Sequence, residues 1–392
     1  MAAPNNPDDV MISSPRAGLA AAAVLALIGC APAAARTPAA GSASVAPVRD
    51  STPDPIAAMV ARLNLESYKA TVKGLTQFGD RRQGTDRNRA AVDWIEAQLK
   101  SYGCTPTERI TYQYQPPAPR PRPAGASASG IPRRPPGGGR FRGVVQPTGA
   151  NEDSLAQRDT AIRATNRQPT APGERQEVYC TKVGTTHPDE MYIVGGHMDG
   201  RGWGEAANDD GSGTALVMEL ARVFSSPDVK TDRSIRFILW NNEETGLNGA
   251  RAYVEQRQAL QGIESPKGSG RYPEPRWLGM VQHDMMMFDH GMPNADGTMP
   301  KTQRAEADVN VEFQSSAKFA AGAQALAWAF ANANEKYATD YPATVGQHMT
   351  NTDSAPFQDI IPAISLRENE RGAQIGAGWD PQWHQPTDLF TT

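Results

Sequence analysis

One histidine and three aspartates stand close together in the segment 195–213, which reads GGHMDGRGWGEAANDDGSG. His197 and Asp199 lie near its start, and Asp209 and Asp210 begin twelve positions after His197. Most of the other residues are small and offer little surface to pack. A segment that only connected two elements would not need these groups, so we consider them candidates for metal binding or acid–base chemistry.

Groups of the same kind follow two later apolar runs. Asn241-Asn242-Glu243-Glu244 comes after the run 234–240, and the run 277–283 ends in His283 and is followed by Asp284. Apolar runs of this length predict buried strands, and ligands bind beyond the carboxyl ends of parallel strands. Carboxylates gathered at one sheet edge would repel one another unless a cation neutralised them. Mixed histidine and carboxylate ligands suit zinc, and manganese or cobalt are alternatives.

Each piece also has an ordinary structural interpretation. A His-x-Asp pair after a strand is commonly a hydrogen-bonded pair, and a Glu-Glu pair is commonly a solvated turn. His384, in the stretch WHQPTD, could be a surface histidine beside a proline. The common position of the groups after strands or in glycine-rich turns is what favours a site. For the remaining histidines we expect structural or exposed positions; they are His187, His283, His290 and His348.

Strand and helix patterns alternate along most of the chain. The periodicity predicts helices over 55–75, 88–103, 213–224, 246–260 and 315–338. It predicts strands over 108–114, 190–196, 234–240, 277–283 and 362–366. Such alternation indicates an α/β fold, with a mostly parallel mixed sheet sandwiched by helices in three αβα layers.

Composition sets the class of protein. The chain has 392 residues, of which 39% are hydrophobic and 21% charged, as is typical of a soluble globular protein. The net charge of -4 provides no basic field for nucleic acid, so we expect no such partner.

The N-terminal residues resemble an export signal. Within 1–35, Arg16 precedes the apolar run 20–28, which is too short to span a membrane as a stable helix. Leu27-Ile28-Gly29-Cys30 resembles a bacterial lipobox, which implies a lipid anchor at Cys30 and a periplasmic or outer-membrane-anchored lipoprotein. Cleavage after APAAA would instead release a periplasmic or secreted protein, and an Ala-rich tail is the third interpretation.

The rest of the chain is interpreted as a tether and one domain. Residues 36–54 are Ala/Pro/Ser-rich and read as a tether, and 55–392 form a single domain. A Pro/Gly/Arg-rich stretch at about 115–175 is predicted to be a disordered surface insertion. In an oxidising compartment Cys104 and Cys180 could form a disulfide, and two buried thiols are the alternative.

Five motifs together resemble a known family. In order they are GGHMDG, ANDDGSG, LWNNEETGLNGARAYV, HDMMM and WHQPTD. This series is similar to the co-catalytic zinc aminopeptidases of metallopeptidase family twenty-eight, of the bacterial leucyl aminopeptidase and aminopeptidase S type. The resemblance covers about 56–112 and 176–392 and implies the zinc-exopeptidase, phosphorylase/hydrolase-like fold.

The resemblance implies a role for each matching residue. Asp209 would bridge two Zn²⁺ ions, His197 and Asp284 would complete one zinc site, and Glu244 and His384 would complete the other. Glu243 would be the general base, and Asp199 would orient the His197 ring. Family members also carry a strained peptide at the Asp-Asp pair, so we expect Gly211 and Gly213 to supply backbone freedom.

The implied function is hydrolysis of the N-terminal bond of peptides with a free amino end. Two zinc ions about 3.5–4 Å apart would share a water, lower its pKa and polarise the scissile carbonyl. Glu243 would accept the proton of the water and return it to the leaving amine. Three competing functions are a carboxypeptidase or dipeptidase of the same superfamily, a glutaminyl cyclase with one zinc, and a non-catalytic surface module.

Three features depart from the family pattern. The family places a helix after the final histidine, whereas the sequence continues for eight residues beyond His384. Where the family often reads Ser-Asp-His before Pro-Phe, this chain reads Thr352-Asp353-Ser354-Ala355. The Pro/Arg-rich stretch has no counterpart that we can match.

Overall fold

One sheet of eight strands runs through the computed structural model, with the order β1-β2-β4-β3-β5-β8-β6-β7. The strands are β1 (Thr107–Tyr114), β2 (Gly173–Lys182), β3 (His187–His197), β4 (Arg233–Trp240), β5 (Arg276–His283), β6 (Val309–Phe313), β7 (Ala343–Gly346) and β8 (Ala363–Arg367). β4, β3, β5 and β8 pair in parallel, whereas β1, β2 and β6 add antiparallel pairs. The predicted mixed sheet is therefore confirmed.

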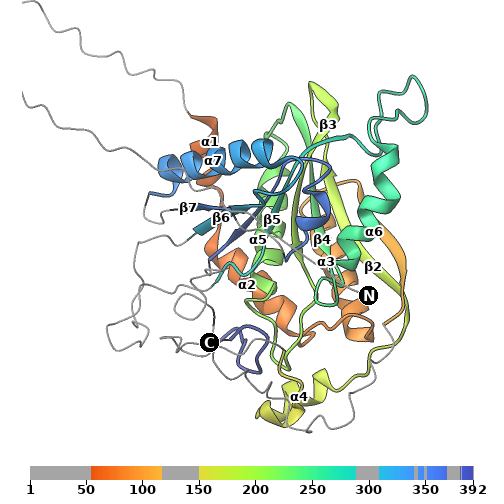
Figure 1. Cartoon of the computed structure of the whole chain (residues 1–392), viewed down its shortest axis with the longest axis vertical. Helices are drawn as coiled ribbons and strands as arrows, with labels where there is room; N and C mark the ends of the chain where they lie inside the picture. Colours follow the sequence, from red (N-terminus) through yellow and green to blue (C-terminus); the bar gives the residue numbers. More distant parts are fainter. Residues whose placement is uncertain are drawn as a thin grey trace, which may run out of the picture. The chain divides into compact units, whose positions relative to one another are not determined.

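The structure describes residues 54–116, 150–287, 309–339, 343–347, 351–368, 380 and 382–391. The helices are α1 (Pro55–Val60), α2 (Leu65–Thr76), α3 (Asp86–Ser101), α4 (Thr160–Asn166), α5 (Gly211–Phe224), α6 (Asn248–Arg257) and α7 (Ala320–Tyr337), with short 3-10 turns η1 (Ser154–Ala156), η2 (Gln258–Leu260) and η3 (Ala355–Phe357) (Figure 1). Within these ranges, no helix is long and apolar enough to cross a membrane. The expected export signal, Cys30 and almost all of the tether lie outside the described residues and stay predictions.

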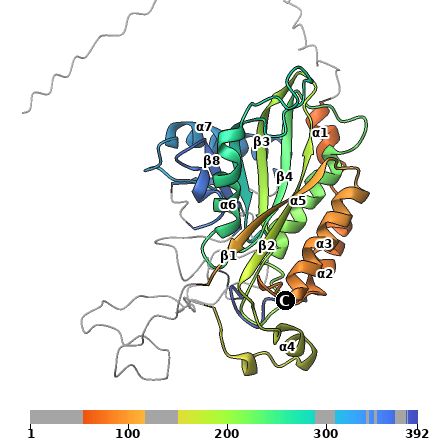
Figure 2. The ribbon, with the colours of Figure 1, turned by 90° about the vertical axis from the view of Figure 1, so that its right-hand side faces the viewer.

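Helices cover both faces of the sheet, which gives three layers (Figure 2). Successive side chains of β4 pack against helices on opposite faces of the sheet. Phe237 and Leu239 pack in a core with residues of α3 and α5, whereas Ile238 and Trp240 point the other way and pack with residues of α6. Because successive side chains of a strand alternate between faces, a fully apolar strand needs cover on both sides.

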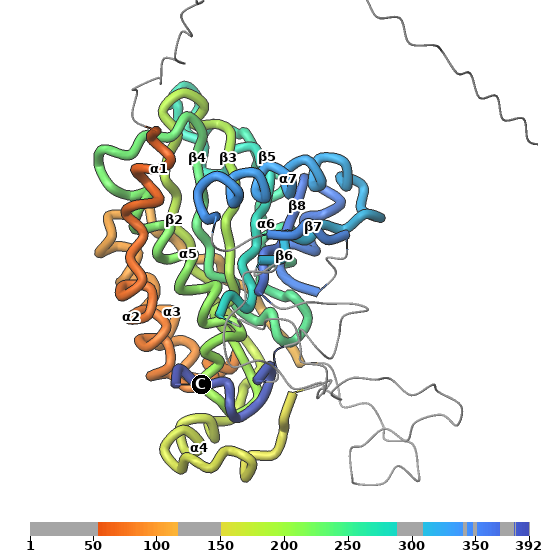
Figure 3. The backbone as a smooth tube through the Cα atoms, turned by 90° about the vertical axis from the view of Figure 1, so that its left-hand side faces the viewer, coloured from red at the N-terminus to blue at the C-terminus, as the bar shows by residue number. Residues whose placement is uncertain are grey.

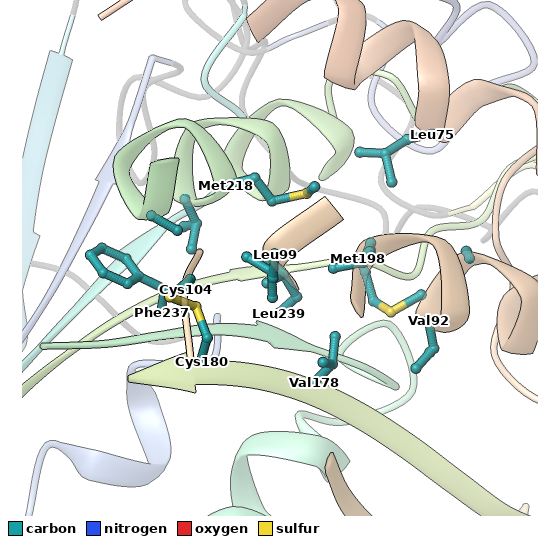
Figure 4. Packing of buried hydrophobic residues seen from close by; sticks show 14 residues of the cluster. Leu75, Val92, Leu99, Cys104, Val178, Cys180, Met198, Met218, Phe237 and Leu239 are labelled. Atoms are coloured by element: carbon teal, nitrogen blue, oxygen red, sulfur yellow. A yellow bond between two sulfur atoms is a disulfide. The ribbon is translucent and has the colours of Figure 1, made fainter. Parts of the chain in front are cut away.

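Cys104 and Cys180 form a disulfide in the core beneath α3 and α5 (Figure 4). Both residues are buried, at 1% and 0% exposure. The bond joins the end of the α3 segment to β2 across 76 positions of the chain. Of the two alternatives left open by the sequence, the structure therefore has the disulfide.

Replacing Cys104 and Cys180 together by alanine should lower the free energy of unfolding by about 2–4 kcal/mol, because the unfolded chain is then no longer restricted by the cross-link. Urea unfolding with and without reductant measures this loss. Reductant should destabilise the unaltered protein and leave the double variant unchanged. An equal response of both proteins would contradict the assignment.

The predicted disordered insertion at 115–175 is too long, because its C-terminal part, 150–175, is ordered. Residues 150–175 include η1, α4 and the start of β2. Asn166 at the end of α4 is 3% exposed, accepts a hydrogen bond from the Asp80 amide (3.0 Å) and donates to the Gly204 carbonyl (2.7 Å). These hydrogen bonds to the backbone of distant residues hold the segment in place. Because they involve polar groups, no apolar pattern in the sequence predicts that the segment is ordered.

Candidate metal centre

Three neighbouring parallel strands deliver the predicted groups to one edge of the sheet. β3 ends at His197, β4 ends just before Asn241, and β5 ends just before Asp284. Asp209 reaches the same edge from the loop that precedes α5, and His384 reaches it from the C-terminal segment 382–391. The five residues predicted as ligands therefore converge, although they span almost half of the chain.

These five residues form two clusters that share Asp209. Ligand atoms of His197, Asp209 and Asp284 lie within 4.8 Å of one another, as do those of Asp209, Glu244 and His384. In the first cluster, His197 Nε2 is 3.2 Å from Asp209 Oδ1 and 3.9 Å from Asp284 Oδ1. In the second, His384 Nε2 is 3.0 Å from Asp209 Oδ2 and 2.8 Å from Glu244 Oε2. Each oxygen of the Asp209 carboxylate thus serves one cluster.

The electrostatics of the two histidines fit a cation site. Burial disfavours the charged form of His384, but the carboxylates of Glu244 and Asp209 outweigh it and raise its pKa to about 10. The pKa of His197 is likewise raised well above its usual value, because Glu243 and Asp209 outweigh the effect of burial. Excess negative charge therefore draws protons onto both rings. Divalent cations would displace those protons, so metal binding and proton release are coupled here.

Glu243 lies beside these clusters and belongs to neither. It lines a cavity of about 330 Å³ together with Glu244, Asp284 and His384. Burial raises the pKa of Glu243 well above its usual value, with a further contribution from Glu244. A carboxylate that favours the protonated form and faces a cavity is suited to accept and return a proton.

Asp199 has a different contact from the one expected. The His197 Nδ1 is 2.9 Å from the backbone carbonyl oxygen of Asp199, whereas the Asp199 carboxylate is 3.9 Å away. That carboxylate instead accepts hydrogen bonds from the amides of Glu243 (3.0 Å) and Glu244 (3.4 Å). Asp199 therefore orients the ring through its main chain and the Glu243-Glu244 turn through its side chain.

The backbone at Asp209 and Asp210 has a cis peptide bond, although residue 210 is not proline. We expected Gly211 and Gly213 to supply backbone freedom next to this bond. That expectation is wrong, since neither glycine has a positive φ. Gly213 is needed for space instead. A Cβ there would lie 2.4 Å from the His283 carbonyl oxygen and 2.5 Å from Asp210 Oδ1.

Asp210 connects the elements that carry the site. Its carboxylate accepts hydrogen bonds from the amides of His197 (2.9 Å), Gly213 (2.8 Å) and Met285 (3.1 Å). These amides belong to the end of β3, the first turn of α5 and the segment after β5. The side chain also caps the N-terminus of α5. The sequence singled out Asp210 with Asp209 but assigned it no role.

Two further histidines have the structural or exposed positions that we expected. His283 is buried, its Nδ1 lies 3.4 Å from the Gly195 carbonyl oxygen, and burial lowers its pKa to about 4. His187 is exposed at the start of β3. His290 and His348 fall outside the described residues, and their predicted positions stay untested.

Two positioning residues near the ligands, Asp388 and Arg367, were given no role from the sequence, although Asp388 is the last residue of the WHQPTD motif. Asp388 accepts hydrogen bonds from the amides of Asn208 (2.8 Å) and Asp209 (3.1 Å), which attaches the C-terminal segment to the Asp209 turn. Figure 3 shows this segment close to the region around α4, and Gln157 Nε2 donates to the Pro386 carbonyl (2.8 Å). On the other side, fully buried Arg367 lies 3.2 Å from Asp284 Oδ2.

Arg81 is a third positioning residue, and no pattern in the sequence points to it. It is 0% exposed, and its guanidinium donates to the carbonyls of Met198 (2.6 Å), Glu205 (2.8 Å) and Ala206 (2.7 Å). These carbonyls border the loop that carries Asp199 and precedes Asp209. One buried side chain thereby fixes the course of that loop.

Arg81→Met should lower the free energy of unfolding by about 3 kcal/mol or more, because two buried carbonyls and one part-buried carbonyl lose their donor and each unsatisfied buried group costs about 1–3 kcal/mol. Thermal or urea unfolding measures the loss. Arg89→Met is the matched control on exposed surface of α3 and should change stability by less than about 0.5 kcal/mol. Equal stability of both variants would contradict this role.

The family follows from a sequence comparison. The profile of Peptidase family M28 matches residues 177–392, which include all five candidate ligands. This chain belongs to Peptidase family M28. One curated relative of this M28 chain is aminopeptidase YwaD of Bacillus subtilis (strain 168), which is 45% identical over 69 residues, or 18% of this chain and 14% of YwaD. Another is carboxypeptidase Q of Xenopus laevis, which is 36% identical over 73 residues, or 19% of this chain and 16% of the relative.

The fold of the M28 chain also has solved counterparts. The LapA aminopeptidase of Legionella pneumophila is 19% identical, with a TM-score of 0.53 over 85% of this chain and 68% of LapA. That likeness shows the shared fold. The chain spans less than a fifth of the length of the two curated relatives named above.

Proposed function

We propose that this chain is a metal-dependent aminopeptidase that holds two zinc ions and uses Glu243 as general base. The observation that carries the proposal is the Asp209 carboxylate, which is shared by two three-residue clusters at the wall of a cavity. Two histidines and three carboxylates are a donor set that suits zinc. His197, Asp209 and Asp284 would hold one ion, and Asp209, Glu244 and His384 the other.

The residues of the chain have distinct parts in this reaction. Bound zinc supplies polarisation of the scissile carbonyl and a lower pKa for the attacking water. Glu243 takes the proton of that water and passes it to the leaving amine, so that the peptide bond is replaced by a carboxylate and a free amine. Asp199 keeps Glu243 in place through the amide hydrogen bond described above.

Recognition of the amino end is expected at the acidic groups of the cavity. Asp209, Glu243, Glu244 and Asp284 line it. Two bound Zn²⁺ ions would balance the charge of these carboxylates, so we expect the free amino group to be held locally, near the second cluster and the acids beside it. This favours cleavage of the first peptide bond of a substrate with a free N-terminus.

A carboxypeptidase or dipeptidase is the second candidate, favoured by the likeness to carboxypeptidase Q. The decisive assay compares aminoacyl chromogenic substrates with N-blocked and C-terminal ones, with and without chelator. The proposal expects chelator-sensitive release from the aminoacyl substrates. Activity on N-blocked peptides alone would overturn it. A metal content of about one ion per chain would favour a glutaminyl cyclase. An absence of turnover with every substrate would favour a non-catalytic module.

We also propose that the protein is exported, as a periplasmic, secreted or lipid-anchored form. The signal-like segment with Cys30 supports export. The buried Cys104–Cys180 bond is in keeping with it, because disulfides persist mainly in oxidising compartments. Mass analysis of the mature N-terminus would distinguish a lipidated Cys30 from a free terminus.

A further inference from the structure

Arg201 is the one lysine or arginine among the described residues that line the cavity. The other charged lining residues are four carboxylates and two histidines. Arginine keeps its charge at all physiological pH values, so the cavity has a permanent positive group on a wall that is otherwise acidic.

Two contacts fix the position of this guanidinium. Arg201 Nη1 donates to the backbone carbonyl of Glu244 (3.3 Å), and Nη2 donates to Glu152 Oε1 (2.6 Å). The Arg201 side chain is 31% exposed and that of Glu152 is 61% exposed. Since arginine has five N–H donors, these two bonds leave donors for a ligand in the cavity that Arg201 lines.

The ion pair with Glu152 does not by itself explain why an arginine lines the cavity. Exposed ion pairs stabilise a fold little, at about 0–1 kcal/mol. A planar guanidinium with spare donors is well matched to a carboxylate, which it can bind through two parallel hydrogen bonds. The position of Arg201 therefore indicates ligand recognition.

We propose that Arg201 binds a carboxylate on the substrate residue that follows the scissile bond. The inference rests on the proposed function. Arg201 contacts the main chain of Glu244, whose side chain is in the second cluster, so the guanidinium lies next to the reacting centre. An extended residue spans about 3.3–3.6 Å, so a carboxylate one residue beyond the scissile carbonyl stays close to the reacting centre, beside which Arg201 lies.

The carboxylate has two chemical sources. It is either the C-terminal carboxylate of a dipeptide or an acidic side chain at that position of a longer peptide. The cavity of about 330 Å³ is at the small end of ligand pockets, at roughly 300–1,000 Å³, and so suits a short substrate. Either source makes the enzyme selective for the residue after the cleaved bond.

The test measures two ratios of kcat/KM, Leu-Leu over Leu-Leu-amide and Leu-Glu-amide over Leu-Gln-amide, in the unaltered protein and in Arg201→Gln. We expect at least one ratio to fall by about 10- to 100-fold in the variant, mainly through KM, because a charge-assisted hydrogen bond is lost. A fall in the first ratio identifies the C-terminal carboxylate, and a fall in the second identifies the acidic side chain. Arg201→Lys, which keeps the charge, should restore part of the loss.

Arg82→Gln is the matched control. Arg82 Nη1 lies 3.9 Å from the Oε2 of the same Glu152, but Arg82 does not line the cavity. Both ratios should stay as in the unaltered protein. If both ratios are unchanged in Arg201→Gln, or fall equally in Arg82→Gln, the inference is overturned.

Calorimetric binding separates this result from a failure of the proposed function. The Kd values of the same four peptides are measured with zinc-loaded Glu243→Gln protein, with and without the Arg201 change. A ratio of Kd values that depends on Arg201 supports carboxylate binding even if the unaltered protein hydrolyses none of the peptides. Ratios that do not depend on Arg201 contradict it, whatever the turnover.

Discussion

Glu243→Gln should leave the zinc content unchanged and lower kcat for an aminoacyl anilide by about 10²–10⁴-fold. Glu243 belongs to neither ligand cluster, so its carboxylate is not needed to hold metal. Glutamine keeps the shape and the amide contact to Asp199 but cannot accept the proton of the attacking water. Metal analysis of the purified protein and initial rates measure the two quantities separately.

The control for this variant is Glu255→Gln, a change at an exposed position of α6. It should have the zinc content and the rate of the unaltered protein. A Glu243→Gln protein with full activity would refute the general-base role. A variant that lost metal as well as activity would instead make Glu243 a ligand.

Asp209→Asn should remove both metal ions and with them all measurable turnover. Asp209 contributes one oxygen to each cluster, and a neutral amide is a much weaker ligand than a carboxylate. The metal content should fall from about two ions per chain to near zero. Mass spectrometry of the metal after gel filtration measures this change.

Glu244→Gln is the matched comparison, because Glu244 belongs to the second cluster only. It should leave about one ion per chain, held by His197, Asp209 and Asp284. Equal losses in the Asp209 and Glu244 variants would contradict the shared role of Asp209. Circular dichroism shows whether both variants remain folded.

Local patterns in the sequence were enough to predict the position of the candidate metal centre. His197, Glu244 and Asp284 each follow an apolar run, and those runs are the neighbouring parallel strands β3, β4 and β5. Parallel strands end at a common edge, so the convergence of these groups follows from strand prediction alone. The spacing of the segment 195–213 made Asp209 a candidate, but its bridging role and the ligand role of His384 came from the family resemblance, since neither residue directly follows a strand.

Local sequence patterns do not predict contacts between distant parts of the chain. The order of 150–175 depends on Asn166 and its bonds to Asp80 and Gly204, and polar bonds of this kind have no periodicity. The hydrogen bonds of Arg81 to the carbonyls that border the Asp209 loop likewise follow no periodic pattern in the sequence.

The amino-acid sequence by itself determined the α/β fold, the family and the residues that converge at the sheet edge. Tertiary structure decided which atoms meet there. It placed the two oxygens of Asp209 in different clusters, turned the Asp199 carboxylate towards the Glu243 amide, and brought Arg201 to the cavity wall. The physical reason is that strand ends are specified by local apolar patterns, whereas the direction of a polar side chain depends on partners far away in the chain.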